Sequence, residues 1–420
     1  MMRVHTLVLS VLTIIALSQC SQIRYDGYKV VRVVPQKVEH LLALKALQGQ
    51  QGHDRVDFWI EPRQVGVPVD LSLSPAVFQH LFSSFTLWGM HPVVILNNVQ
   101  ETIDAQRPAP IEAEADFNYE DYHELSEIEA WMKNITDVYS DKASLFEITK
   151  SYEGRTIRGI KISSKSSPTP RPAFWMEGGI HGREWISPAT VIYMTGQMLD
   201  EYDKDADMKE FVDSYDWYIL PVFNVDGYDR TWNGDRMWRK TVSKHGICIG
   251  VDPNRNWDFH WCENGASKDP CSDLYCGPSA FSEVEVKGVA TYIEGIKENL
   301  KGFIDFHSFA EIWMTPWGYT TELPKDFKEL DAGAVAACNA LEAVHGTKYD
   351  HGSVANILDV SSGSSADWTY GAVGVKYSYG VELRDKGQYG FLLPADQILP
   401  SGQETLQAII ALTKFITNNP

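Results

Sequence analysis

The chain has 420 residues, of which 44% are hydrophobic and 12% aromatic, so it can form apolar cores in two or three domains. Its net charge of −19, with an isoelectric point near 5.0, argues against nucleic acid or an anionic membrane as the main partner.

Residues 1–20 predict a secretory signal peptide. A short basic start precedes a mostly apolar run from Leu7 to Leu17, and the Ser-Gln-Cys that follows offers small residues for cleavage. The run is too short to span a bilayer, and no other stretch is long and apolar enough. We therefore expect a secreted, extracellular protein without a membrane span, in an oxidising compartment.

Residues 21–107 predict a small α+β domain. YKVVRVV, VDFWI and HPVVILNNV have strand character, whereas VEHLLALKALQ and PAVFQHLFSSFTLWG have helical spacing. This gives an order close to β-α-β-α-β. The next stretch, ETIDAQRPAPIEAEAD, is polar and contains proline, as is typical of a linker, and we place the linker between the domains at residues 108–116.

Residues 117–420 predict one large α/β domain. RPAFWMEGGIHG, WYILPVFNVDGY and GFIDFHSF are apolar strands, and they alternate with long helical segments near 187–202, 283–300, 327–346 and 403–419. This alternation indicates a sheet covered by helices on both faces. Functional residues of such folds gather where strands end, which is where His181, Asn224, Asp226 and His307 stand.

A metal site is the strongest chemical signal. His181 and Glu184 stand at i and i+3 in HGREWISP, and His307 ends the apolar run of FIDFHS. Two histidines and one carboxylate, with an open position, form the ligand set of zinc peptidases. Alone, the His-x-x-Glu pair also fits ordinary surface residues. Asp252 is the candidate for orienting one histidine ring, or it is a simple turn aspartate.

Several cations stand near these candidates. In so acidic a chain they suggest an anionic substrate group, because guanidinium matches carboxylate geometry; structural ion pairs are the alternative. The candidates are Arg183, Arg236, Arg239, Arg255 and the neighbouring Asn254.

Glu382 ends another apolar strand and is a candidate general base for water activated by the metal. The alternative is a structural salt bridge with Arg384 or Lys386.

Four of the six cysteines cluster between residues 248 and 276, which in a secreted chain indicates disulfides. Their spacing leaves three connectivities open. Cys338 stands alone in a helical apolar run and is expected to be a buried free thiol. Asn134 begins a glycosylation sequon.

Together these motifs resemble the zinc metallocarboxypeptidases of the pancreatic A/B type. HGREWISP, RMWRKT, GVDPNRNW, FIDFHS, SGSSADW and ELRDKGQYGFLLP occur in the order of that family. The resemblance runs from about Phe117 to the C-terminus, and residues 25–106 resemble the family's inhibitory pro-domain. It implies a monomeric pre-pro-enzyme with a mixed, twisted sheet, which is activated by another protease.

The resemblance also implies residue roles. His181, Glu184 and His307 would hold one zinc ion, Glu382 would be the general base, and Arg239 would stabilise the oxyanion. The residues implied to contact the substrate, a peptide C-terminus, are Arg183, Asn254, Arg255, Ser308 and Asp359. The implied disulfides are Cys248–Cys271 and Cys262–Cys276.

The specificity pocket follows from the same resemblance. Members that cut after Lys or Arg have Asp immediately before the Asp-Trp dipeptide, where this chain has Ala366. The other matching positions, Val354, Gly318 and Gly380, are small or apolar. A pocket without a charge does not offset the desolvation of Lys or Arg, so we expect release of aliphatic and aromatic C-terminal residues.

The chain departs from the family at two places. Asp359 replaces a mobile tyrosine that hydrogen-bonds the terminal carboxylate, and an ionised Asp cannot donate such a bond. We expect weaker substrate binding, unless Asp359 faces solvent or favours a basic group. The linker region's basic residue, Arg107, precedes Pro108. Trypsin-like enzymes cleave Arg-Pro bonds poorly. We therefore expect activation by another protease, or at another site before Phe117.

Two other functions compete with the leading hypothesis. One is the same enzyme with a preference for basic C-terminal residues. The other is a catalytically silent peptide-binding relative, which the presence of all three ligands, the base and the oxyanion arginine disfavours.

Overall fold

The computed structural model describes residues 22–48, 56–107, 117–164 and 171–420. The expected signal peptide and the linker at 108–116 lie outside the described residues. Within the described ranges, no helix is both long enough and apolar enough to cross a membrane.

The small domain is an antiparallel four-stranded sheet with the order β2-β3-β1-β4. Its strands are β1 (Lys29–Val33), β2 (Val56–Ile60), β3 (Val69–Leu73) and β4 (Val93–Leu96), and its helices are α1 (Val38–Gln48), α2 (Pro75–Leu87) and α3 (Val99–Gln106). Successive side chains of a strand point to opposite faces of the sheet, so this sheet contacts two different cores. Val31 and Val33 face the domain's own core, whereas Val30 belongs to a cluster shared with the large domain.

Two elements of this domain correct the expected β-α-β-α-β order. The segment Val69–Leu73 forms the extra strand β3, whose Asp70 pairs with Arg32 of β1 at 2.7 Å. Residues 101–106, whose polar composition is typical of a linker, belong to α3 instead. Ile103 buries against the large domain, and this contact stabilises a short helix that is otherwise mostly polar.

The large domain is built on a mixed eight-stranded sheet with the order β13-β12-β14-β11-β7-β8-β6-β5. Its central strands β14, β11, β7 and β8 are parallel, and antiparallel pairings flank them. The strands are β5 (Ala143–Lys150), β6 (Thr156–Ile162), β7 (Ala173–Gly178), β8 (Asp216–Leu220), β11 (Leu300–His307), β12 (Ile312–Thr315), β13 (Asp350–Ser353) and β14 (Tyr377–Glu382).

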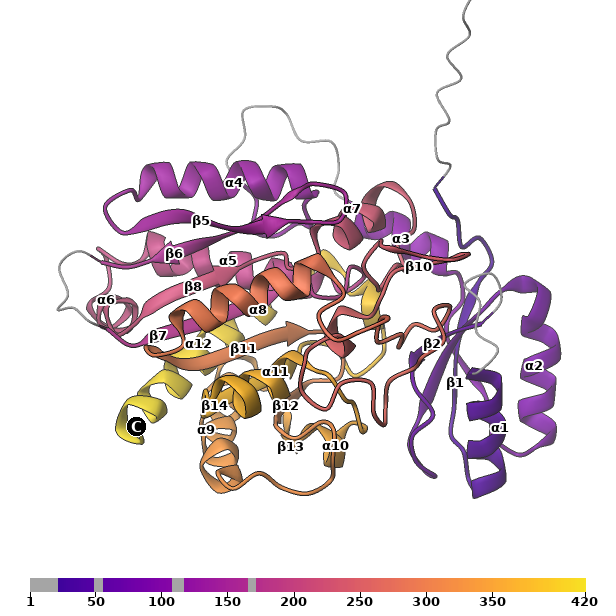
Figure 1. Cartoon of the computed structure of the whole chain (residues 1–420). Helices are drawn as coiled ribbons and strands as arrows, with labels where there is room; N and C mark the ends of the chain where they lie inside the picture. Colours follow the sequence, from indigo (N-terminus) through magenta and orange to yellow (C-terminus); the bar gives the residue numbers. More distant parts are fainter. Residues whose placement is uncertain (1–21, 49–55, 108–116, 165–170) are drawn as a thin grey trace, which may run out of the picture.

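Helices cover both faces of this sheet, as expected for buried parallel strands. In Figure 1, α8 (Val284–Ile296) lies in front of the sheet, and α5 (Ile186–Asp200) and α12 (Ile398–Asn418) lie behind it. The remaining larger helices are α4 (Leu125–Val138), α6 (Ala206–Asp213), α7 (Val225–Asn233) and α9 (Phe327–His345). The elements α4, β5 and β6, which form one edge of the domain, are additions to the helices and strands expected from the sequence.

The small domain lies beside the loops at one end of the large sheet (Figure 1). Trp59 of β2 packs edge-on against Phe391 at 5.6 Å, in a cluster that also contains Val30 and Phe309. Disulfides join Cys248 to Cys271 and Cys262 to Cys276, the pairing that the resemblance implies. Cys338 is a buried free thiol in α9, as expected.

Candidate active site

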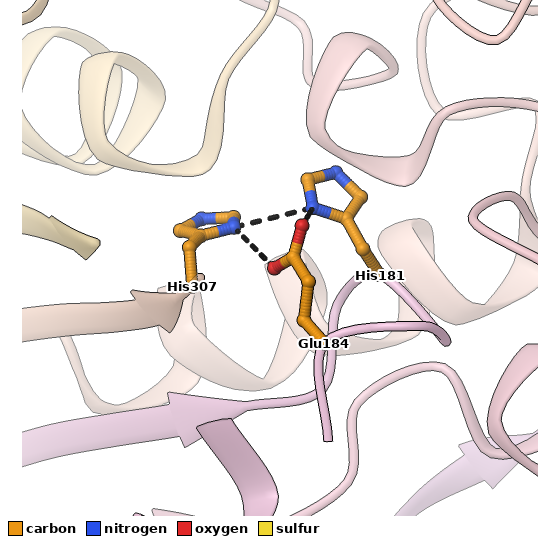
Figure 2. Close-up of side chains that lie close together, drawn as sticks. All are labelled: His181, Glu184 and His307. Atoms are coloured by element: carbon orange, nitrogen blue, oxygen red, sulfur yellow. Dashed lines mark hydrogen bonds and ion pairs between the residues drawn. The ribbon is translucent and has the colours of Figure 1, made fainter. Parts of the chain in front are cut away.

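Three side chains converge at the carboxyl ends of two central strands. His181 and Glu184 lie in the loop between β7 and α5, and His307 is the last residue of β11. Figure 2 shows all three pointing toward one another. His181 Nδ1 lies 2.8 Å from a Glu184 oxygen and 3.2 Å from His307 Nδ1, and His307 Nδ1 lies 3.3 Å from the other Glu184 oxygen. All three residues are buried.

The loop is held in place by close backbone packing. Gly182 donates its N–H to the carbonyl of Arg239 at 3.1 Å. A Cβ at this position would lie 2.6 Å from the carbonyl oxygen of Gly227, so a larger residue would push the loop outward. The glycine in HGREWISP therefore sets the position of both flanking ligand candidates.

The outer nitrogen of each ring lies against a carboxylate. His181 Nε2 is 3.1 Å from Asp252, the residue expected to orient it, and His307 Nε2 is 3.0 Å from Asp305. If each Nε2 carries the proton, both Nδ1 atoms present lone pairs toward one point. Two facing lone pairs beside a carboxylate fit a divalent cation, and this donor set is one that zinc prefers.

Asp305 was not among the sequence candidates. Its signal is the strand alternation in FIDFHS, which puts Asp305 and His307 on one face of β11. Its neighbour in β7 is Glu177, another fully buried carboxyl. Burial and the charge of Asp305 raise the pKa of Glu177 well above its ordinary value, so Glu177 stays neutral.

Arg239 connects the ligand group to Asp252. Its Nη2 donates to Asp252 at 2.9 Å, and its Nη1 lies 3.6 Å from Glu184. Burial disfavours the charged guanidinium, but Asp252 and Glu184 outweigh it and raise the pKa of Arg239. Arg239 is therefore a fixed cation at the edge of the ligand group.

Glu382 makes neither of the alternative salt bridges. Arg384 pairs with Glu404, and Lys386 lies 3.8 Å from Glu311. One carboxylate oxygen of Glu382 is buried without a hydrogen-bond partner. Burial, opposed by His307, raises the pKa of Glu382 to about 7. A carboxyl in this state is suited to accept and return a proton near neutral pH.

A cavity of about 370 Å³ joins these groups to most of the expected substrate contacts. Asn254 Oδ1 accepts from the Ser365 N–H at 2.9 Å, and Arg255 donates to the Gly265 carbonyl at 2.8 Å. The candidate residues lining the cavity are His181, Arg183, Glu184, Arg239, Asn254, Arg255, His307, Ser308, Val354, Asp359, Ala366, Gly380 and Glu382.

Gly318 lies outside the residues that line the cavity. It is close to Val354, and its N–H donates to both oxygens of Asp367 at 2.9 Å. Gly318 therefore helps to hold the short helix α11 (Ser365–Trp368), which also carries Ala366, and its expected place in the specificity pocket stays a prediction. Asp359 lies at the cavity with an exposed side chain, and its carboxylate accepts from the Val360 N–H.

Three residues whose sequence positions suggested the site are structural instead. Asn224 caps α7 by accepting from the Gly227 N–H, and Asp226 pairs with Arg155. Arg236 stacks on Trp185 at 3.7 Å. Strand ends attract polar residues for helix capping and ion pairing as well as for catalysis, so position alone did not separate these roles.

The small domain contributes residues to the same cavity, which no motif in the sequence indicated. Asp57 lies 3.3 Å from Arg183, and Arg63 donates to the Leu358 carbonyl at 2.9 Å, next to Asp359. Glu61 lines the cavity beside them. These contacts depend on the docking of two domains, which no local pattern encodes.

The family model "Zinc carboxypeptidase" matches residues 128–408, and the model "Carboxypeptidase activation peptide" matches residues 31–106. The chain belongs to the zinc carboxypeptidase family. Its cofactor is therefore zinc, and residues 31–106 are the family's activation peptide, called the pro-domain below.

Relatives span both named types of this family. Carboxypeptidase B of Astacus astacus is 43% identical over 71% of this chain and 98% of its own length. Zinc carboxypeptidase A 1 of Anopheles gambiae is 38% identical over 93% of this chain and 89% of its own. The crystal structure of thrombin activatable fibrinolysis inhibitor matches with a TM-score of 0.88 and 34% identity, covering 94% of this chain and 100% of that one.

Proposed function

We propose that the protein is the secreted zymogen of an exopeptidase that releases aliphatic or aromatic residues from peptide C-termini. The observation that carries this proposal is that the ligand group, Arg239 and Glu382 all face one cavity, with Ala366 and Gly380 in its wall. Bound between His181, Glu184 and His307, zinc would act as a Lewis acid toward the scissile carbonyl and the attacking water.

The chain's own residues supply the remaining chemistry. Glu382 takes the proton of the attacking water and later gives it to the leaving amine, which suits a carboxyl with a pKa near 7. Arg239 stabilises the negative charge that develops on the carbonyl oxygen. By comparison with one lost oxyanion donor, such a contact contributes about 2.7–4 kcal/mol.

The terminal carboxylate is bound by Arg183, Asn254 and Arg255, with Ser308 lining the same cavity. Requiring a free carboxylate makes the reaction exopeptidic, because an internal peptide bond has none. The last side chain enters the pocket formed by Val354, Ala366 and Gly380, which contains no charge to offset the desolvation of Lys or Arg.

Asp359 supports a second candidate, in which basic C-terminal residues are preferred. It is an exposed carboxylate at the cavity, near Arg63 of the pro-domain. Burial lowers the pKa of Arg63, and the charge of Asp359 opposes this shift. A cationic substrate side chain would gain the same attraction once the pro-domain has left.

Hydrolysis of two blocked dipeptides by the processed protein, one ending in Phe and one in Arg, tests the proposal. Chelator-sensitive release of Phe in preference to Arg is the expected result. Preferred release of Arg would favour the second candidate. Release of neither, with zinc bound, would indicate a silent peptide-binding protein.

A further inference from the structure

Asp305 connects the proposed zinc ligand His307 to the wall of the substrate pocket. The two side chains share one face of β11, and Asp305 Oδ2 lies 3.0 Å from His307 Nε2. The same oxygen accepts a hydrogen bond from Ser365 Oγ at 2.6 Å. Ser365 directly precedes Ala366 of the specificity pocket.

The environment of Asp305 is unfavourable for a carboxylate. Asp305 is fully buried, and its Oδ1 has no hydrogen-bond partner. The neighbouring residue on β7 is the buried Glu177. Among the described residues, the only ion pair of Asp305 is with His307, so no Lys or Arg offsets its desolvation. Burying this carboxylate costs desolvation free energy that no Lys or Arg offsets. Its presence therefore points to a role other than stability.

Asn254 lies on the other side of the ring and binds the backbone of the pocket segment. Its Oδ1 accepts from the Ser365 N–H at 2.9 Å, and its Nδ2 lies 3.2 Å from His307 Nε2. With the proton on Nε2, the ring and the Asn254 amide present N–H groups to each other, so the link between the pocket segment and the ring runs through Ser365 Oγ and Asp305. A shift of this segment would move Asp305 and the ring together.

We propose that Asp305 is a positioning residue that holds the His307 ring with its proton on Nε2 and couples its orientation to the pocket segment through Ser365. His181 has a matching arrangement in its contact with Asp252. The inference rests on the ligand set in the proposed function. Carboxylates in this position change metal affinity by about 10–100-fold when removed, because they fix ring orientation and raise ligand basicity.

The test measures the zinc dissociation constant of the full chain by competition with a chelator. Asp305→Asn keeps the size of the side chain but removes its charge, and we expect zinc binding to weaken at least about tenfold. Ser365→Ala removes only the link to the pocket, and we expect a loss of about three- to tenfold. Both variants should also shift the visible absorption of the cobalt-loaded protein, which a purely structural role would not do.

Asp226→Asn is the matched control. Asp226 is an equally buried carboxylate near a strand end, but it pairs with Arg155 rather than with a proposed ligand. It should lower the Tm and leave the zinc constant and the cobalt spectrum unchanged. Asp305→Asn binding zinc within twofold of wild type would overturn the inference. If that variant does not fold, an unchanged zinc constant in Ser365→Ala would do so.

His307→Ala separates this inference from the proposed function. If it retains zinc affinity, the ligand set itself is wrong. If it loses zinc while Asp305→Asn does not, the ligand set stands and only the role of Asp305 fails.

Discussion

The Asp57 carboxylate of the pro-domain lies 3.3 Å from the Arg183 guanidinium of the large domain, and both side chains are more than nine-tenths buried. Trp59 Nε1 donates to the same carboxylate at 3.0 Å, and the Arg183 guanidinium stacks on Phe391 at 4.1 Å. Arg183 is one of the residues that we propose to bind the substrate's terminal carboxylate. In the uncleaved chain, a carboxylate of the protein itself already engages it.

Asp57→Ala should therefore free Arg183 to bind a substrate carboxylate in the uncleaved protein. Removing one partner of a buried ion pair costs about 3–5 kcal/mol, so we expect peptide hydrolysis by the full-length chain to rise by at least about a hundredfold. Asp26→Ala removes an exposed ion pair with Arg24, just before the pro-domain, and is the control that should have no such effect. Equal basal activity in both variants would show that the Asp57 contact does not block the cleft.

The raised pKa of Glu61 makes docking of the pro-domain depend on pH. Burial and the charge of Asp273 raise the pKa of Glu61 to about 8. Because this value is raised, the docked state favours the protonated form. The stability that protonation contributes is therefore complete below the ordinary Glu pKa of 4.5, falls as pH rises above it, and is lost once pH passes about 8. Glu61→Gln mimics the protonated form and should match wild type in Tm near pH 5 but exceed it near pH 9. A constant difference across this range would contradict the assignment.

Glu382→Gln tests the proposed base. The amide cannot accept the proton, so kcat of the processed protein should fall by about 10²–10⁴-fold with zinc content unchanged. Glu404→Gln, which breaks the structural pair with Arg384, is the comparison and should lower the Tm rather than kcat. A Glu382→Gln variant that keeps half of the wild-type kcat would exclude this role.

Asp359→Tyr should lower KM for peptide substrates by about tenfold. The change removes a charge that repels the terminal carboxylate and adds a hydroxyl donor, and a hydrogen bond to a charged group contributes about 1.5–3 kcal/mol. Asp359→Asn removes the charge alone and should give a smaller decrease. An unchanged KM in both variants would mean that Asp359 faces solvent during turnover.

Ala366→Asp should move the preference of the pocket toward basic C-terminal residues. A buried carboxylate at this position would offset the desolvation of Lys or Arg, and we expect the ratio of kcat/KM for Arg-terminal and Phe-terminal substrates to rise about thirtyfold or more. Ala366→Asn has the same size without the charge and should leave the ratio near wild type. The same rise in both variants would show that size rather than charge decides selectivity.

Local patterns predicted the central elements of the fold. The apolar runs of β7, β8, β11 and β14 and the long helices α5, α8, α9 and α12 have strong periodicity, because buried elements require continuous apolar faces. The missed elements β3, β5 and β6 alternate polar and apolar residues over short lengths, and α3 is held by contacts with the large domain. Tertiary packing stabilises such segments more than their own composition does.

The sequence by itself determined the chemistry: the family, the metal-binding residue types and the residues proposed to catalyse and bind substrate, since each depends on side-chain identity in an ordered motif. Only the tertiary structure decided which polar residues at strand ends share the cavity and which, such as Asn224 and Arg236, support the fold. It also brought Asp57 to Arg183 and Asp305 to Ser365. These pairs are separated by 126 and 60 positions, and their contact depends on domain docking and strand order, which no local pattern encodes.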